Sequence, residues 1–319
     1  MSALASRIDR ETLRQWLPVL TLVVLCAIVG FVTPQFLQIQ TLLVLAADTA
    51  TLFVLATGVT FVIMLGGIDL SIQAMASLAS VIVALTVTQL GYGSIFLAIA
   101  VGALSGVCGG LAHVRLKIPS FIATLAVSGV LAGTALVISG ARSITLGEEQ
   151  RAYLSWVSSV SFGIPHEVII GIIVLVVANI VQGRTRFGRY SAAIGAGEAA
   201  AYASGVKVDR QKVIALTLSG ALAGFAGVIL AGRLASGSPT LANELLLPSI
   251  AAVVVGGTAI TGGVGSIWRT AVGALIISVI RIGMTFVGVD IFAQQIVFGV
   301  VLILAVAITI DRSKIPIVK

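Results

Sequence analysis

Charge is scarce in this 319-residue chain. Between Arg14 and Arg115 lie 100 positions that carry only two formal charges, Asp48 and Asp69. Charged residues make up 10% of the composition, hydrophobic residues make up 58%, and the mean hydropathy is +1.16. Soluble globular domains carry about 25% charged residues. The scarcity excludes an ordinary soluble enzyme and predicts a protein that spans a lipid bilayer.

Residue patterns typical of catalysis and of metal or nucleotide binding are also missing. The chain has two histidines, His113 and His166, and two widely separated cysteines, and it contains no H-E-x-x-H, G-x-S-x-G or C-x-x-C pattern. A phosphate-binding G-x-x-x-x-G-K-[ST] loop is absent as well. We therefore expect no enzyme activity, no metal and no cofactor, and structural roles for both histidines. The basic residues that give the net charge of +7 follow short loops, which indicates membrane topology rather than nucleic-acid binding.

Long apolar runs fill almost the whole chain. Runs of membrane-spanning length predict helices at 16–33, 42–65, 70–88, 94–113, 119–139, 167–183, 211–232, 245–262, 266–287 and 291–310. The 35 glycines fit helices that pack closely through small residues. The predicted fold class is all-α: a polytopic membrane protein with about ten transmembrane helices, forming a single domain over residues 1–319.

The basic residues provide an independent test of this topology. Ten crossings place both termini and every second loop on the cytoplasmic side, where Lys and Arg are enriched. Fifteen of the 19 Lys and Arg residues then lie on that side, three lie outside, and one falls within a helix. Two loops are long: an outer one at about 140–166 and a basic cytoplasmic one at about 184–210. Small residues at helical spacing in the second loop predict one or two short amphipathic helices on the cytoplasmic face.

The two carboxylates inside the apolar stretch are the only candidates for carrying a coupling ion. A regular helix between Asp48 and Asp69 would separate them by about 30 Å, which is unsuited to a proton relay. Asp48 lies near an outer helix end and is predicted to make an interfacial or helix–helix contact. Asp69 has two interpretations: it is the N-cap of a helix beginning near Leu70, or it lies on a permeation path.

Two glycine clusters interrupt the apolar runs. The segment from Val62 to Gly67 resembles the segment from Val253 to Thr258, which favours two like-oriented halves, an arrangement found in transporters. Each cluster is either an ordinary turn or an interrupted helix that forms part of a gate.

Four segments carry a resemblance to a known family. They are Gly66-Gly67-Ile68-Asp69-Leu70-Ser71, Lys117 to Leu125, Thr185 to Gly195 with Glu198-Ala199-Ala200 and Ser204-Gly205, and Ile250 to Ser266. In this order they resemble the membrane permease subunits of bacterial ATP-binding-cassette importers for monosaccharides, of the ribose, xylose and galactose type. Gln73 and Arg269 stand where that family usually has glycine, and a different pentose, a deoxyhexose or a polyol fits as well as ribose.

The resemblance implies about ten helices with cytoplasmic termini in the bacterial inner membrane. It also implies a cytoplasmic ATPase, a periplasmic sugar-binding protein and a second permease copy or a homologous permease. The residues that would dock on the ATPase are Arg186, Arg189, Glu198, Ala199, Ala200 and Gly205. The candidates for the permeation path or gate are Gly66, Gly67, Asp69, Ser71, Gln73, Gly256, Gly257 and Thr258.

The predicted function is inward passage of a monosaccharide or related polyol by alternating access, driven by ATP hydrolysis in a separate chain. Two alternatives stay open: an ion-coupled secondary transporter of a small polar solute, and an ATP-binding-cassette permease for branched-chain amino acids.

Overall fold

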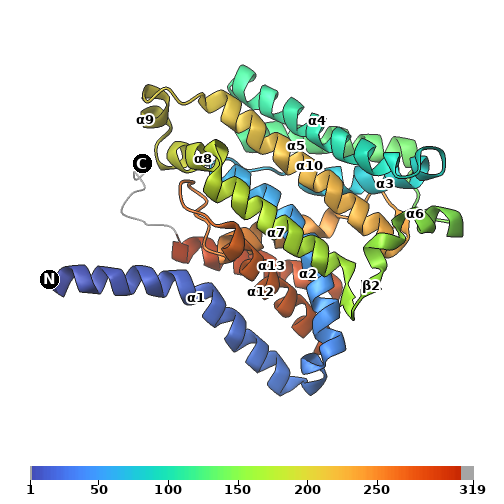
Figure 1. Ribbon diagram of the computed structural model, residues 1–319, viewed down its shortest axis with the longest axis horizontal. Helices are drawn as coiled ribbons and strands as arrows, with labels where there is room; N and C mark the ends of the chain where they lie inside the picture. The colour runs from blue at the N-terminus through green and yellow to red at the C-terminus, as the bar shows by residue number, and fades with distance from the viewer. Residues whose placement is uncertain (1, 310–319) are drawn as a thin grey trace.

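The computed structural model describes residues 2–309 and is almost entirely helical (Figure 1). Its elements in chain order are α1 Ser2–Val32, η1 Pro34–Leu37, α2 Ile39–Ile63, α3 Ile72–Leu90, α4 Gly93–Leu116, α5 Ser120–Ser139, β1 Ile144–Thr145, α6 Glu148–Ser158, β2 Val160–Ser161, β3 Ile164–Pro165, α7 His166–Arg184, α8 Arg186–Ala196, α9 Glu198–Ala203, α10 Val208–Leu234, β4 Ser236–Gly237, η2 Asn243–Leu245, α11 Leu246–Val255, α12 Ile267–Phe286 and α13 Ile291–Thr309.

Seven helices in the described part of the chain are long and apolar enough to cross a membrane: α2, α3, α4, α5, α7, α10 and α12. Three shorter apolar segments, Trp16–Val32, Asn243–Val255 and Phe292–Ala307, fall where the sequence predicts the other runs. The predicted helix at 245–262 is wrong in its extent. Helix α11 covers only Leu246–Val255, because a glycine-rich loop begins at Gly256 and continues to Ser266.

Helix α2 forms the centre of the molecule. Every residue from Thr49 to Leu65 is buried, so this part of the helix has no face left for lipid. A helix that is apolar on all sides is expected in such a position. Helices α7, α10, α11 and α12 pack around it.

Helix α10 packs against α2, α3 and α4, and glycines make this close approach possible. A Cβ atom on Gly106 of α4 would lie 2.1 Å from the backbone oxygen of Leu216, and one on Gly220 of α10 would lie 2.1 Å from that of Gly102. Backbones this close exclude any side chain at these positions, so the small-residue packing predicted from the glycine content is present.

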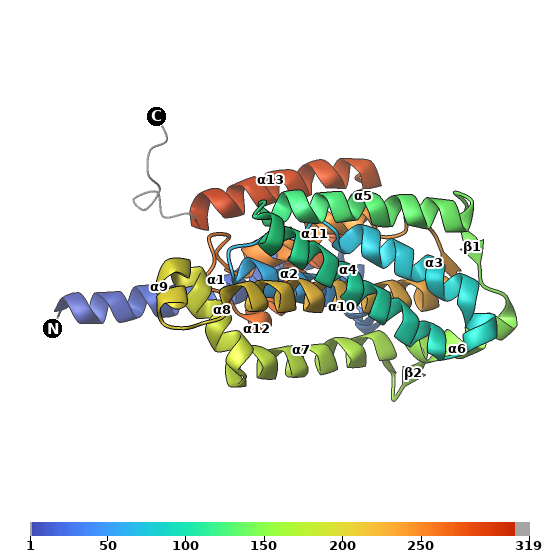
Figure 2. The ribbon, with the colours of Figure 1, turned by 90° about the horizontal axis from the view of Figure 1, so that it is seen from above.

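The two ends of the helix bundle differ in structure. Helices α8 and α9 and the start of α1 lie at one end, and α6 and β2 lie at the other (Figures 1 and 2). The predicted loop at 140–166 contains α6 and the three two-residue strands β1, β2 and β3; β2 pairs antiparallel with β3, and β1 pairs antiparallel with β4, which follows α10. These short strands depart from the all-helical prediction, because the loops pair their backbone groups with one another.

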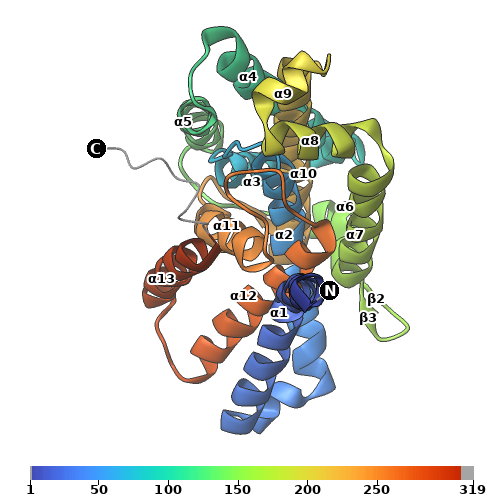
Figure 3. The ribbon, with the colours of Figure 1, turned by 90° about the vertical axis from the view of Figure 1, so that its left-hand side faces the viewer.

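The first and last helices lie at the edge of the molecule. Helix α1 extends away from the body and packs against α12, while α13 packs against α11 (Figure 3). A small apolar cluster of Phe36, Leu45 and Val279 anchors this region.

Candidate functional site

The first glycine cluster ends helix α2. Gly66 has a left-handed backbone with φ of 78° and donates its N–H to the Ile63 oxygen, while Gly67 donates to the Val62 oxygen. This pair of bonds is the Schellman arrangement, which favours glycine because the backbone is left-handed. The chain then runs without helical structure from Gly67 until α3 begins at Ile72.

The second glycine cluster ends helix α11 in the same way. Gly257 has φ of 85° and donates to the Val254 oxygen, while Thr258 donates to the Val253 oxygen. The sequence similarity between the two clusters is therefore a shared helix-termination motif. Both clusters are helix ends followed by irregular backbone.

The end of α2 meets the loop that follows α11. The Gly263 N–H donates to the Met64 oxygen at 3.0 Å. A Cβ atom on Gly262 would lie 2.7 Å from the Gly66 nitrogen, so the two loops pack backbone to backbone. Residues 196 and 199 positions apart in sequence, Gly66 with Gly262 and Met64 with Gly263, thus form one contact region, which the sequence pattern alone does not reveal.

Helix α8 completes this contact region. A Cβ atom on Gly195 would lie 2.1 Å from both the Gly263 nitrogen and the Met64 oxygen. We call the meeting point of Met64, Gly66, Gly195, Gly262 and Gly263 the glycine junction. Any shift of α8 must move both helix ends or break these contacts, because no side chain lies between them to absorb the motion.

The two short helices predicted in the loop at 184–210 are confirmed as α8 and α9. Arg186 and Arg189 are exposed on α8, as are Glu198, Ala199 and Ala200 on α9. Gly205 is exposed and left-handed, with φ of 81°. These six residues are therefore accessible to a partner chain.

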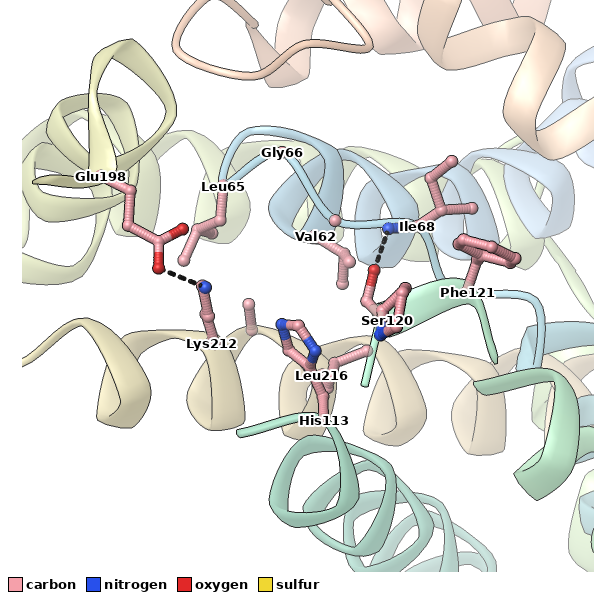
Figure 4. A pocket seen from close by; sticks show the side chains of 13 residues that line it. Val62, Leu65, Gly66, Ile68, His113, Ser120, Phe121, Glu198, Lys212 and Leu216 are labelled. Atoms are coloured by element: carbon pink, nitrogen blue, oxygen red, sulfur yellow. Dashed lines mark hydrogen bonds and ion pairs between the residues drawn. The ribbon is translucent and has the colours of Figure 1, made fainter. Parts of the chain in front are cut away.

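A cavity of about 280 Å³ lies between α9 and the end of α2 (Figure 4). Gly66, Gly67 and Glu198 all line it, so the structure brings a predicted docking residue next to two predicted gate residues. Glu198 forms an ion pair with Lys212 of α10 at 2.7 Å, and the two side chains are 55% and 17% exposed. The ion pair links α9 to α10.

Asp69 lies at the start of α3 and is almost completely buried, with 1% of its surface exposed. One carboxylate oxygen accepts the Ser71 N–H at 2.9 Å and the Ser71 hydroxyl at 2.6 Å, and the other accepts the Ser219 hydroxyl of α10 at 2.7 Å. The N-cap of α3 is Ser71, so the prediction that Asp69 is itself the N-cap is wrong. Asp69 instead closes the turn before the helix, and it links α3 to α10.

The remaining gate candidates lie next to Asp69 or at the end of α11. Gln73 is half-buried in the first turn of α3, and Ser71 is buried beside Asp69. Thr258 is fully buried after α11, and a Cβ atom on Gly256 would lie 2.5 Å from the Arg269 oxygen of α12. The structure thus distributes the candidates over two neighbouring helix ends.

Asp48 forms an ion pair with Arg233 in the last turn of α10, and the two side chains are 29% and 28% exposed. Its predicted helix–helix contact is confirmed. Two carboxylates in the apolar core are thus both held by α10, Asp69 through a hydroxyl and Asp48 through a guanidinium.

Both histidines hydrogen-bond to backbone carbonyls. The His113 Nδ1 lies 2.6 Å from the Ile118 oxygen, and the His166 Nδ1 lies 2.7 Å from the Trp156 oxygen. Since a carbonyl only accepts, each Nδ1 carries its proton. These contacts fit the structural roles predicted for both residues.

Sequence reasoning missed three residues of the site: Gln182, Gly195 and Lys212. Gln182 was detectable, because an amide in an otherwise apolar membrane helix is a polar group that needs a partner. Lys212 and Gly195 carried no such signal, since a lysine at a helix end and a glycine among small residues are both common.

Comparison with known proteins now adds to this geometry. Residues 41–306 match the family described as branched-chain amino acid transport system / permease component. The chain is 38% identical to the ribose import permease protein of Bacillus subtilis, over 93% of this chain and 92% of that protein. It is 33% identical to a probable ABC transporter permease protein of Escherichia coli, over 86% of this chain and 82% of that protein. It is also 33% identical to the L-arabinose transport system permease protein of Escherichia coli, over 81% of this chain and 78% of that protein. No solved structure matches it significantly. The chain belongs to this family of transport-system permease components.

Proposed function

We propose that this protein is the membrane subunit of an ATP-binding-cassette importer in the bacterial inner membrane, and that it passes a monosaccharide or related polyol into the cytoplasm by alternating access. The relatives named for ribose and L-arabinose support a sugar rather than a branched-chain amino acid, although the family as a whole carries the amino-acid description. Membership of a permease family also disfavours the ion-coupled alternative.

ATP hydrolysis is assigned to a separate chain, because the sequence holds no phosphate-binding loop. The relative named as a probable ABC transporter permease supports the same assignment of transport to this chain and of ATP hydrolysis to another. A binding protein outside and a second permease copy, or a homologous permease, complete the proposed complex.

We assign the end of the bundle that holds α8 and α9 to the cytoplasm, together with both termini, and we propose ten crossings. The excess of Lys and Arg on that side supports this orientation. Helices α1 and α13, and α11 together with the irregular loop that follows it, then supply the three crossings beyond the seven longer helices.

One observation carries the proposed mechanism: through Gly195, α8 touches both the end of α2 and the glycine-rich loop that follows α11. Docking of an ATPase on the exposed residues of α8 and α9 would push directly on the glycine junction. Rigid elements in contact transmit such a displacement, since packed interiors deform little. The irregular segments after α2 and α11 then act as the moving parts of the gate.

The proposed function is tested by reconstitution. The chain is inserted into liposomes with its ATPase and binding protein, and uptake of labelled pentoses, deoxyhexoses, polyols and leucine is measured with and without ATP inside. We expect ATP-dependent uptake of one polyhydroxylated solute and none of leucine. Uptake by the chain alone, driven by a proton or sodium gradient, would refute the proposal.

The role of Glu198 is tested by a charge swap. Glu198→Lys removes both the ion pair with Lys212 and the negative charge offered to the ATPase, and we expect it to uncouple ATP hydrolysis from transport. The double variant Glu198→Lys/Lys212→Glu rebuilds the ion pair with reversed polarity. If it stays uncoupled, Glu198 acts at the docking surface; if coupling returns, the residue serves only to hold α9 on α10.

A further inference from the structure

Gln182 lies in the last turn of α7 and contacts the glycine-terminated end of α2 and the loop before α12. Its side-chain oxygen accepts the Ile267 N–H at 2.9 Å. Its side-chain nitrogen donates to the Gly265 oxygen at 2.9 Å and lies 3.2 Å from the Met64 sulfur. One amide therefore joins α7 to the end of α2 and to the loop before α12.

The amide satisfies backbone groups that the loop leaves free. Ile267 is the first residue of α12, so its N–H has no acceptor within the helix. The side chain of Ser266, at the N-cap, makes no capping bond. Gln182 takes over this function from a different helix, and it fixes where α12 begins.

The backbone of Gln182 supports α8 as well. A Cβ atom on Gly188 would lie 1.8 Å from the Gln182 oxygen, so the first turn of α8 packs directly on the last turn of α7. Figure 3 shows α8 lying across the ends of α7 and α10, beside the loop that precedes α12. Gln182 thus contacts α8 through its backbone and both gate segments through its side chain.

We propose that Gln182 is a positioning residue that transmits movement of α8 to the end of α2 and to the loop before α12, so that these two segments move as one unit. The inference rests on the proposed function, because it assumes that a docked ATPase displaces α8. An amide is suited to this position, because it offers a donor and an acceptor at once and carries no charge into the bilayer region. No other standard residue of this length combines these properties.

Two variants of Gln182 separate transmission from simple packing. Gln182→Met keeps the length of the side chain but removes the hydrogen bonds to Ile267, Gly265 and Met64. Gln182→Glu keeps the acceptor for Ile267 but replaces the donor to Gly265 and Met64 with a second, charged acceptor. In the reconstituted complex we expect the number of solutes transported per ATP hydrolysed to fall about tenfold for Gln182→Met, the effect of losing roughly one net buried hydrogen bond, and by at least as much for Gln182→Glu, whose second oxygen faces the Gly265 oxygen.

Asn179 supplies the matched control. It lies one turn earlier on the same helix, and its amide donates only to the Leu175 oxygen of α7 itself. Asn179→Ala should therefore leave the transport-to-ATP ratio unchanged. Hydrogen–deuterium exchange provides a second measurement: the Ile267 amide should exchange faster in Gln182→Met and at the normal rate in Gln182→Glu. If Gln182→Met does not assemble, the Glu variant and this exchange measurement decide the question.

The outcomes separate the inference from the proposed function. If the unmodified complex shows no ATP-dependent uptake, the proposed function fails. If the unmodified complex transports and both Gln182 variants keep its transport-to-ATP ratio, or if Asn179→Ala lowers that ratio equally, Gln182 has no transmitting role and the inference alone is overturned.

Discussion

Replacement of Asp69 gives the sharpest test of how the bend between α2 and α3 is held. The carboxylate accepts three hydrogen bonds, from the Ser71 N–H, the Ser71 hydroxyl and the Ser219 hydroxyl, and it is almost fully buried. Bonds to a charged group contribute about 1.5–3 kcal/mol each, and a buried donor left without a partner costs about 1–3 kcal/mol. The burial of the carboxylate itself offsets part of this gain.

The two informative substitutions are Asp69→Ala and Asp69→Asn. Alanine removes all three acceptors, and we expect it to lower the free energy of unfolding by roughly 4 kcal/mol. Asparagine keeps an oxygen for Ser71 and offers an N–H to the Ser219 hydroxyl, which can rotate to accept it, so the expected loss is about 1 kcal/mol. Ser219→Ala removes a single bond and should fall between them.

Thermal unfolding of the purified protein in detergent measures these differences, and uptake in the reconstituted complex measures function. The bend interpretation predicts that Asn preserves both stability and uptake, while Ala loses folded protein. If Ala is as stable as Asn, the three bonds do not hold the bend and the reasoning is refuted. If both variants are stable and neither transports, Asp69 acts on the permeation path instead.

Two further predictions concern the packing of α10. Gly106→Ala should separate α4 from α10 and destabilise the protein by about 2 kcal/mol or more, because its Cβ would overlap the Leu216 oxygen. Gly133→Ala on α5 has no atom within 4 Å of the added Cβ beyond its own helix and should be neutral or slightly stabilising. Equal effects of the two variants in thermal unfolding would contradict the packing. Asp48→Asn should lower the free energy of unfolding by about 3 kcal/mol, because it leaves the charge of Arg233 without its partner. The double variant Asp48→Asn/Arg233→Gln should recover much of this lost stability. A double variant less stable than the single one would rule out the ion pair as the cause.

The residues that identify this protein as a membrane transporter subunit are readable from the chain. Hydropathy locates the apolar helices because a bilayer requires about 20 apolar residues for each crossing. The glycine pairs at Gly66 and Gly257 mark helix ends because a left-handed residue there carries almost no steric cost in glycine. The helices α8 and α9 follow from small residues at helical spacing.

Other features depend on residues far apart in the sequence. The N-cap of α3 is Ser71 rather than Asp69, because Ser219 and Ser71 together hold the carboxylate in the turn. The early end of α11 at Val255 arises because its apolar continuation joins a loop that packs on the end of α2.

The sequence by itself therefore determined that the chain lies in a bilayer, its helical content and the approximate positions of its helices, since these depend on local composition and backbone preference. Only the tertiary structure decided that the Gly263 N–H donates to the Met64 oxygen, 199 positions away, that Gly195 of α8 packs on both residues, and that Gln182 joins the end of α2 to the loop before α12. Such contacts are set by how helices fold back on one another. The backbone groups have no local signature in the chain, and the amide of Gln182, although visible in an apolar helix, does not reveal its partners.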